Sequence, residues 1–460
     1  MKKLAYITAV ILLFLFGCKR DTIYTGSDAK LIFSTDTIEF DTVFRSIGSA
    51  TKVVKVYNPL SQSVEISRIY LARGENTPFK ININGKPASS AENIIIQPKD
   101  SIYLFAEVTI DPGVGDLVEQ DSIIFEINGN RQDIKLVAFG WDVHLINGDT
   151  LTTQTWTADK PYLIYNYALV DTGQTLTIEE GTRIFSHKNS YILVFGSIQV
   201  LGSKDKPVIF SADRLEEDYK DIPGQWGGIV LYRTSERNLF NYATIINATI
   251  GLAIDSVRTD TVFVTNCDIE HHSYAGIFAG ASNVTGLNSI IADCGWYALA
   301  LIQGGNYTFY DCTIANFYSW QPRNTPSIAL TNYLIIDNTP VYWTPLKADF
   351  ANCIIWGNRD NEISATSASG TNNFEVNFEY NLIKQKDDFP CINCIINKDP
   401  LFGSINNFDY HLSAGSPAIG TGNLDILNIY PTVLQYDLEG NDRISDNRVD
   451  LGAYQYRENL

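Results

Sequence analysis

Acidic and histidine side chains gather in one part of the sequence, between residues 268 and 311. Asp268 and Glu270 alternate in the string Asp-Ile-Glu-His-His, so both carboxylates share one face if that string is a strand. Two carboxylates on one face are the groups that hydrolyse a glycosidic bond. The candidate catalytic residues are Asp268, Glu270, His271, Asp293 and Asp311.

A structural interpretation of these acids is simpler, because Asp and Asn at strand ends commonly accept hydrogen bonds from backbone amides. The pectinase-type order of Asn-Thr-Asp, Asp-Asp, Gly-His-Gly and Arg-Ile-Lys is absent. Basic residues are scarce between Val262 and Ser319, although a lyase needs a base and a group that neutralises the uronate carboxylate. We therefore favour a protein without catalysis, and a polysaccharide lyase or glycoside hydrolase is the alternative.

Aromatic residues in the same region supply a second kind of chemistry, because exposed rings can stack on sugar rings. In repeat proteins such rings also form ladders inside the core, and the sequence leaves both interpretations open. The candidates for glycan stacking are Trp296, Tyr297, Trp320 and Trp343.

These candidates lie among short strands that repeat. Ile254 and Ile277 occupy similar strings 23 residues apart, and such a period indicates a solenoid. Three short strands per step correspond to one coil of a parallel β-helix, in which each coil packs on its neighbours. The strings Thr-Leu-Thr-Ile-x-x-Gly-Thr and Trp-Gly-Gly-Ile resemble right-handed parallel β-helix proteins over roughly residues 145–400. The segment Tyr318–Phe350 breaks the step, which predicts either a tightened coil or a protruding loop.

The cysteines divide into two groups. Cys267, Cys312 and Cys353 precede similar apolar residues, which predicts equivalent buried positions in stacked coils. Cys391 and Cys394 have CxxC spacing without a second pair or a histidine cluster beside them, so we do not expect zinc. A local disulfide and two free thiols both remain open for this pair.

The region from Leu31 to about Trp141 has a different pattern, with about seven alternating strands separated by turn signals. That number of strands in about 110 residues is typical of an immunoglobulin-like β-sandwich. Residues 40–69 resemble the immunoglobulin-like modules of the ASPM/SPD-2/hydin type, and this resemblance implies packing or spacing without catalysis.

Three strings near the C-terminal end recur together in another family. Ser-Pro-Ala-Ile at 416–419, Asp-Leu-Glu-Gly-Asn-Asp-Arg at 437–443 and Asp-Leu-Gly-Ala-Tyr at 450–454 resemble the choice-of-anchor Q module of surface β-helix proteins. A terminal module must cover the exposed core and unpaired edge, so we expect a cap. Its acids either pair with Arg443 and Arg448 or hold calcium, which takes oxygen ligands. The candidate calcium ligands are Asp437, Asn441, Asp446 and Asp450.

The first 18 residues contain a charged start, an apolar run over Leu4–Phe16, and then Gly17 and Cys18. The Leu-Phe-Gly-Cys order resembles a bacterial lipobox of the kind found in Bacteroidetes-like lipoproteins. This resemblance implies cleavage before Cys18, a lipid on its sulfur and a further acyl group on the new amino terminus, which together anchor the chain in a lipid bilayer. An ordinary signal peptide with an incidental cysteine is the alternative. We expect an outer-membrane anchor, and the periplasmic or cell-surface face stays undecided.

The formal charge of -18 argues against nucleic acid and anionic lipid surfaces as partners. We expect an all-β chain that binds or adheres to a polysaccharide or surface protein without a cofactor, and a purely structural surface stalk is a further alternative. The predicted parts are a signal peptide at 1–17, a tether at 18–30, an immunoglobulin-like sandwich at 31–142, a right-handed parallel β-helix at 143–420 and a C-terminal capping module at 421–460.

Overall fold

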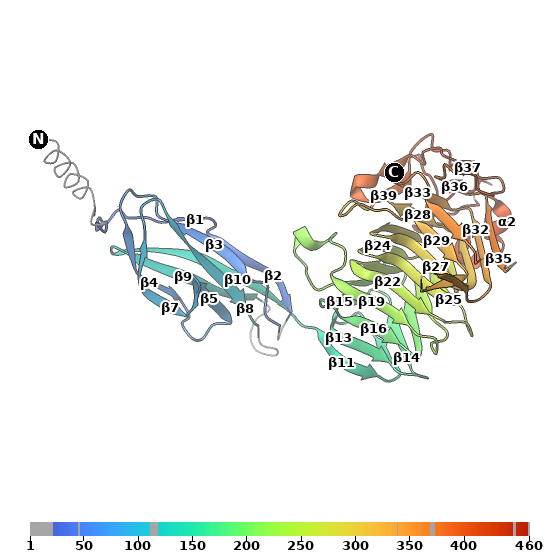
Figure 1. Ribbon diagram of the computed structural model, residues 1–460. Coiled ribbons are helices and arrows are strands. Elements are labelled where there is room, and N and C mark those ends of the chain that lie inside the picture. The colour runs from blue at the N-terminus through green and yellow to red at the C-terminus, as the bar shows by residue number, and fades with distance from the viewer. Residues whose placement is uncertain are drawn as a thin grey trace, which may run out of the picture. The chain divides into compact units, whose positions relative to one another are not determined.

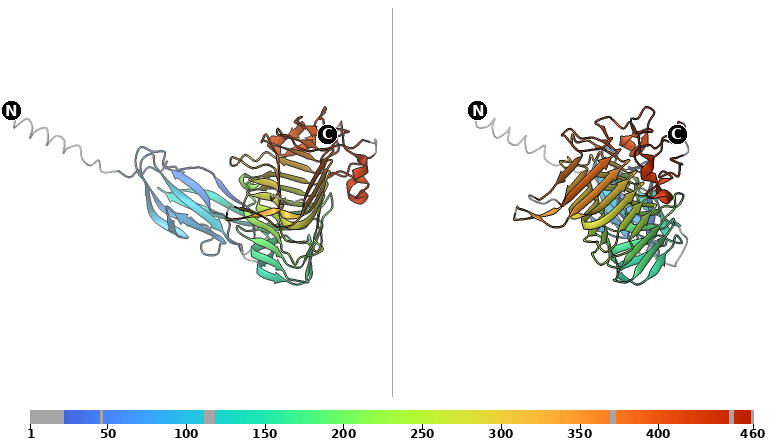
Figure 2. Two further views of the ribbon diagram at one scale, coloured as in Figure 1. Left: turned by 45° about the vertical axis from the view of Figure 1, so that its right-hand side comes forward. Right: turned by 90° about the vertical axis from the view of Figure 1, so that its right-hand side faces the viewer.

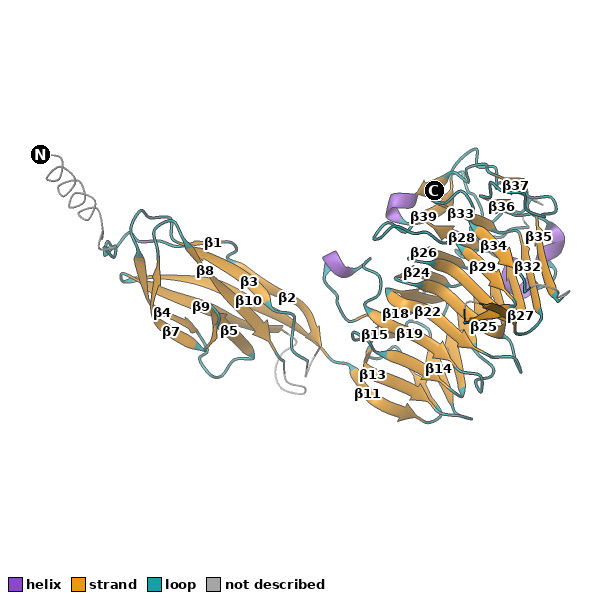
Figure 3. Cartoon of the chain, in the orientation of Figure 1, coloured by secondary structure: helices purple, strands orange, loops and turns teal. Residues whose placement is uncertain are grey.

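The structure is a computed structural model that describes residues 22–44, 47–110, 118–337, 339–368, 373–444 and 448–458. Strands dominate it and the helices are few and short (Figure 3), which confirms the all-β prediction. The chain divides into two units, Met1–Asp142 and Val143–Leu460. The predicted signal peptide and Cys18 lie outside the described residues. No helix in the described ranges is long and apolar enough to cross a membrane.

The first unit is a β-sandwich of two five-stranded sheets (Figure 1). One sheet contains β1 (Ile32–Phe33), β3 (Lys52–Tyr57), β8 (Ser101–Val108), β5 (Phe79–Ile83) and β6 (Lys86–Pro87). The other contains β2 (Thr37–Phe44), β10 (Asn130–Trp141), β9 (Val118–Ile127), β4 (Val64–Leu71) and β7 (Ser90–Ile96). Alternate residues of these strands, such as Leu104 and Ala106 of β8, are buried between the sheets, which is the period of a half-buried strand.

Part of the predicted tether packs on this sandwich. The Tyr24 amide donates to the Ser63 carbonyl, and Asn128 Nδ2 donates to the carbonyls of Tyr24 and Gly26. Ala29 is fully buried. Residues 22–30 therefore belong to the folded unit, because their backbone groups find partners there.

The second unit is a parallel β-helix whose coils stack from β11 to β37 (Figure 1). Its strand pairings follow three faces, which we name A, B and C in the order that the chain visits them. Face A contains β15 (Arg183–Ser186), β18 (Val208–Ala212), β21 (Ala243–Ile246), β24 (Asp268–His272), β26 (Ile290–Cys294), β28 (Thr313–Asn316), β33 (Ile354–Gly357), β36 (Leu382–Ile383) and β37 (Ile395–Ile396).

Face B contains β16 (Tyr191–Val194), β19 (Trp226–Leu231), β22 (Ala248–Asp255), β29 (Ile328–Thr331) and β34 (Ile363–Thr366). Face C contains β12 (Gln154–Trp156), β14 (Thr175–Glu179), β17 (Ser197–Leu201), β20 (Leu239–Asn241), β23 (Val262–Thr265), β32 (Leu346–Ala351) and β35 (Phe374–Glu379). Four longer strands run through two faces: β11 (His144–Leu151) and β13 (Tyr162–Val170) through A and B, β25 (Ala275–Leu287) and β27 (Tyr297–Tyr310) through B and C.

The core of the β-helix is built from columns of aligned apolar side chains. On face A one column runs through successive register partners: Ile184, Phe210, Ile245, Ile269, Ile291, Ile314, Ile355 and Ile383. All of these side chains are fully buried. Stacking of like side chains from coil to coil explains why the sequence repeats at the coil length.

The turn from face C to face A has a fixed backbone conformation. Tyr242, Asn266, Asn288, Asp311 and Asn352 all have positive φ there, which asparagine and aspartate tolerate best. Asn288 Nδ2 donates to Asn266 Oδ1 at 2.8 Å, and Asn352 Nδ2 donates to Asp311 Oδ1 at 3.2 Å. These bonds link neighbouring coils and lock their register.

The segment Tyr318–Phe350, which interrupts the sequence repeat, belongs to one enlarged coil. Thr313 of β28 pairs directly with Ile354 of β33, so residues 313–353 make a single turn of the β-helix. Two excursions take up the extra length: a loop over residues 317–327 in the A–B turn, and a hairpin of β30 (Tyr333–Ile336) and β31 (Thr339–Tyr342) in the B–C turn. The hairpin stands out from the body of the solenoid in the right-hand view of Figure 2.

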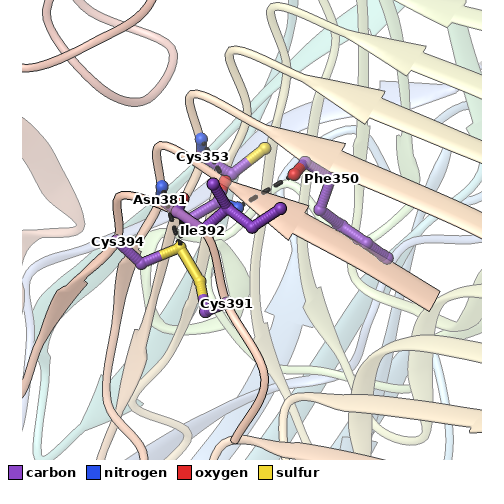
Figure 4. The surroundings of a disulfide bond; sticks show 6 residues. All are labelled: Phe350, Cys353, Asn381, Cys391, Ile392 and Cys394. Carbon is purple, nitrogen blue, oxygen red and sulfur yellow. Dashed lines mark hydrogen bonds between the residues drawn. A yellow bond between two sulfur atoms is a disulfide. The ribbon is translucent and has the colours of Figure 1, made fainter.

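The cysteines follow the coil register. Cys267, Cys312 and Cys353 each precede paired strand residues of face A, and all three are buried free thiols, as the strings predicted. Cys391 and Cys394 form a disulfide (Figure 4). The Asn381 amide donates to Cys394 Sγ at 3.4 Å, so the bridge lies against the final coils and packs on the end of the core.

The C-terminal segment (residues 398–458) lies along the flank of the β-helix. It contains β38 (Phe402–Ser404), η2 (Ile405–Asn407), β39 (Asp409–Leu412), α2 (Leu424–Leu427) and α3 (Pro431–Leu434), and η1 (Glu217–Tyr219) is a further short helix in an earlier loop. The Ala453 amide donates to Thr313 Oγ1, and Arg443 Nη2 donates to Asn288 Oδ1. The segment therefore crosses the sides of several coils, whereas the sequence predicted that it covers the open end.

Candidate functional site

Two of the candidate catalytic acids lie next to each other on the outer surface of face A. Asp268 and Glu270 belong to β24 and flank Ile269, which points into the core. Their register partners on the next coil are Ile290 and Ala292. The strand period thus directs both carboxylates away from the core, onto the flank of the β-helix.

The C-terminal segment covers this part of face A. Tyr410 and Ala453, from residues far along the chain, form one apolar cluster with Ile290 and Ala292. Only 7% of Glu270 is exposed. A bound polymer reaches Glu270 only if the C-terminal segment moves away.

Asp293, one coil further on, is held by two donors. The Tyr410 hydroxyl donates to its Oδ2 at 2.5 Å, and the Phe317 amide donates to its Oδ1 at 3.2 Å. Burial still raises the pKa of Asp293 to about 6, because these hydrogen bonds only partly offset the cost of removing a carboxylate from water.

Burial has a larger effect on the two β24 acids. Burial, and after it the nearby charge of Asp293, together raise the pKa of Asp268 to about 7. The pKa of Glu270 lies well above its usual range for the same reasons, with burial first and then Asp268 and Asp293. Protonated carboxyl groups tolerate an apolar cover, which explains how this cluster fits beneath tyrosine rings.

The two histidines of β24 are also buried. His271 packs edge-on against the Phe408 ring at 4.3 Å, and its Nε2 is 3.6 Å from Glu270 Oε2. Burial lowers the pKa of His271 to about 4 and that of His272 to about 3. Both histidines are therefore neutral near pH 7, and His271 is a hydrogen-bonding group and a weak base there.

Asp311 does not join this cluster. It belongs to the C–A turn column, where Asn352 donates to it and the charge of Arg443 faces it. Burial raises its pKa to about 7. The structure therefore brings Asp268, Glu270 and Asp293 together with His271. It places Asp311 apart from them, in the column of Asn and Asp residues at the C–A turn.

An open cleft lies in the A–B turn, beside the 317–327 loop. It consists of three neighbouring hollows of about 600, 420 and 200 Å³. The first two share Asn358 and Arg359 as wall residues, and the second and third share the run Tyr318–Trp320. The smallest hollow ends at His271 and Asp293, so the cleft reaches the edge of the covered acid cluster.

A buried ion pair holds the loop that forms this cleft. Arg323 Nη2 lies 2.7 Å from Glu362 Oε1, and both side chains are fully buried. Arg323 also donates to the carbonyls of Asn316 and Thr325. Both terminal nitrogens of the guanidinium and both oxygens of the carboxylate have hydrogen-bond partners, while the buried Arg323 Nε has none. This two-point pairing gives the loop one defined conformation.

The coil geometry agrees with two family models. The chain contains right-handed β-helix domains. Residues 148–253 match the pectate-lyase-like β-helix domain, and residues 227–383 match the right-handed β-helix region. No curated protein matches the chain. A solved structure of a family 123 glycoside hydrolase from Clostridium perfringens, described for glycolipid glycan hydrolysis, matches with a TM-score of 0.18 and 8% identity over 24% of this chain and 25% of that chain. A similarity this low carries no argument.

Aromatic rings form a second feature on the β-helix domains, across the 317–327 loop from the cleft. Trp296 is 51% exposed, and its ring lies 5.5 Å from Tyr274 and 6.5 Å from Tyr297. We name these three residues and Phe278, which is 5.9 Å from Tyr274, the aromatic cluster. Thr325 of the loop donates to the Trp296 carbonyl, which joins this cluster to the loop.

The other two stacking candidates lie apart from the aromatic cluster. Trp320 is 54% exposed and lines two of the three hollows. Trp343 follows the protruding hairpin in the B–C turn and lines none of these hollows. The structure thus places Trp296, Tyr297 and Trp320 around one loop and separates Trp343 from them.

The candidate calcium ligands have other partners. Asp437 accepts hydrogen bonds from the amides of Glu439, Asn441 and Gln455 and from Asn441 Nδ2, while Asp450 accepts from Gly420 and Tyr456. Asp446 lies outside the described residues. Within the described ranges no group of three acidic, histidine or cysteine side chains could hold a metal ion. These contacts support a hydrogen-bonding role for Asp437 and Asp450 and give calcium no support.

The sequence missed the residues that close one site and shape the other. Tyr410 and Phe408 carry no local signal, because they reach face A only through the path of the C-terminal segment. Arg323 had a weak signal, since it lies in an irregular Trp- and Pro-containing run that interrupts the repeat, and irregular loops on a rigid scaffold often carry function.

Proposed function

We propose that this protein is a membrane-anchored lipoprotein that binds a glycan without catalysis, in the cleft of the A–B turn and on the adjoining aromatic cluster. The observation that carries the proposal is the exposed Trp320 ring, which lines two connected hollows. A large apolar ring above hydrogen-bonding side chains is the arrangement that recognises a sugar, because each sugar has an apolar face and a polar rim.

The fixed loop adds to this argument. Trp320 belongs to a loop that the buried pair of Arg323 and Glu362 holds in place. A binding site that is ordered before its ligand arrives pays less conformational entropy on association. The match to the pectate-lyase-like β-helix domain supports a carbohydrate ligand by analogy of fold, which is a weaker warrant than the site itself.

The absence of catalysis is proposed from the position of the acids. Glu270 lies beneath the C-terminal segment, away from the open hollows. Asp360 in the largest hollow is 3.7 Å from Lys386 at a fully solvated position. Asp293, the buried carboxyl at the edge of the cleft, is held by Tyr410 and the Phe317 amide and lines a different hollow from Asp360 and Asp387. None of the three hollows is therefore lined by a buried and an exposed carboxyl group together, which is the pair that acid and base catalysis needs.

A glycan array followed by titration calorimetry tests the binding proposal. Trp320→Ala should weaken the affinity for the best array ligand by about 10- to 100-fold, because it removes a stacking ring. Trp343→Ala is the matched control, since it removes an equally exposed indole outside the cleft, and its affinity should equal that of the parent. Equal losses in both variants, or no array ligand at all, would contradict the proposal.

Two further measurements test the other parts of the proposal. Incubation with polysaccharides should release no reducing ends and no unsaturated uronate, and either product would favour the enzyme alternative. Cys18→Ala should move the protein from the membrane fraction to the soluble fraction or leave it unprocessed. Unchanged membrane fractionation of that variant would contradict the lipid anchor.

A further inference from the structure

The lining of the cleft distinguishes between neutral and acidic sugars. Its largest hollow, of about 600 Å³, is lined mostly by uncharged polar side chains. These are Asn324, Asn358, Asn361, Ser364 and Gln385. Amides and hydroxyls both donate and accept hydrogen bonds, so they match the hydroxyl groups of a neutral sugar in either orientation.

Two of the three charged side chains that line that hollow are acidic, and the third is Arg359. The two acids are Asp360 and Asp387. Asn361 Nδ2 donates to Asp387 Oδ2 at 2.8 Å, which fixes that carboxylate in place. A sugar carboxylate placed among these groups is repelled, and the repulsion acts over the Debye length of about 8 Å at physiological salt.

Each cation around the cleft has at least one polar partner, and Lys386 Nζ lies 3.7 Å from Asp360 Oδ2. Arg323 is bound to Glu362, and Arg359 Nη1 donates to the Arg323 carbonyl at 3.2 Å. Lys384 Nζ donates to the Gly357 carbonyl at 2.7 Å. Selective capture of a uronate carboxylate uses a guanidinium that presents two parallel N–H groups. Arg323 already binds Glu362 with both of its terminal nitrogens.

We infer that the cleft selects a neutral oligosaccharide and discriminates against uronate polymers. This inference rests on the proposed glycan-binding function and narrows its ligand class. The discrimination comes from two lining carboxylates, Asp360 and Asp387, that outnumber the single lining guanidinium of Arg359. A like-charge contact at the surface weakens binding by about tenfold, so a uronate oligomer should bind at least that much more weakly than its neutral counterpart.

The test compares two forms of one ligand on the purified full chain. Oligouronates of the galacto, gluco and manno series are measured by calorimetry beside the same oligomers after carboxyl reduction, which changes only the charged group. In the series that binds best, the reduced form should bind at least about tenfold tighter. Asp360→Asn combined with Asp387→Asn should move the ratio of the two affinities toward one.

Asp218→Asn, which neutralises an exposed acid outside the lining, is the control and should leave that ratio unchanged. Equal or tighter binding of the oligouronate by the parent chain overturns the neutral-ligand inference and leaves the glycan-binding function intact. Absence of binding in every series and on a neutral glycan array overturns both.

Discussion

The covered acids of face A and the open cleft of the A–B turn are neighbours, since Asp293 and Trp320 line one hollow, and the two regions have opposite environments. Asp268 and Glu270 project from a regular strand, and a segment from far along the chain buries them. Trp320 projects from an irregular loop and stays exposed. In a solenoid, reactive residue types on a strand are therefore no guide to an accessible site, because a later segment can pack on that face.

The largest expected effect comes from releasing the C-terminal segment. Arg443 is fully buried, donates to Asn288 Oδ1 and the Gly452 carbonyl, and faces the Asp311 charge. Arg443→Ala leaves these groups unpaired, so it should reduce the free energy of unfolding by about 3 to 5 kcal/mol. Urea denaturation measures this change.

Arg457→Ala is the matched control, because Arg457 is exposed and contacts only the Asp442 carbonyl among the described residues. Its free energy of unfolding should stay within about 0.5 kcal/mol of the parent. If Arg443→Ala changed the free energy of unfolding as little as Arg457→Ala, the C-terminal segment would be only loosely bound to face A. The contrast between a covered face A and an open cleft would then fail.

The second effect is a pH dependence of stability. The pKa values of Asp268 and Asp311 are raised to about 7, and burial raises the pKa of Glu270 well above its usual range, so the folded state holds more protons than the unfolded state. Stability is then present at low pH and is lost as pH rises through the folded pKa values. Between pH 6.5 and pH 8 the free energy of unfolding should fall by about 1 to 3 kcal/mol.

The two buried histidines limit the pH range in which the acids dominate the pH dependence of stability. The pKa of His271 and His272 is lowered by burial, so each contributes stability that is lost as pH falls below about 6.5. Above pH 6.5 the acids dominate. Asp268→Asn should flatten the pH profile there, and a stability that increases from pH 6.5 to pH 8 would contradict the burial of these acids.

A smaller effect is expected from the hydrogen bond that joins the cover to the cleft edge. Tyr410→Phe removes the donor to Asp293 Oδ2 and keeps the ring. The loss of one hydrogen bond to a buried carboxyl group should cost about 1 to 2 kcal/mol at pH 8 and less at pH 5, where the carboxyl is protonated. Thermal denaturation at the two pH values measures the difference, and equal losses at both would show that the ionised carboxylate is not its partner.

The smallest effect is expected at the hairpin. Trp343→Ala should change the free energy of unfolding by less than about 0.5 kcal/mol, because the side chain is 47% exposed and lies outside the cleft. A larger loss in a denaturation experiment would show that the hairpin supports the coils, and the contrast between rigid coils and added loops would need revision.

The coil was predictable because its signal is local. Ile254 and Ile277 indicated the repeat although their alignment is two residues out of register, because Ile254 pairs with Ala279 and Ile277 with Leu252. Cys267, Cys312 and Cys353 repeat their neighbours, since each coil buries equivalent positions. The pattern of residues over one coil length was enough to predict the β-helix.

The cover and the cleft were not predictable in the same way. Tyr410 meets Asp293 across 117 residues, and no period in the sequence connects them. The enlarged coil was ambiguous as well, because a count of residues between Cys312 and Cys353 does not tell a loop from a compressed coil. Long-range packing decides both features, and the free energy of such contacts depends on the whole fold.

The enlarged coil has one consequence for how this molecule can change. Thr313 and Ile354 keep their pairing although a loop and a hairpin separate them, so the stacking of strands is indifferent to what each turn carries. Loops of different length and specificity can therefore be inserted in the A–B and B–C turns. The strands of the coils keep the register that lets the chain fold.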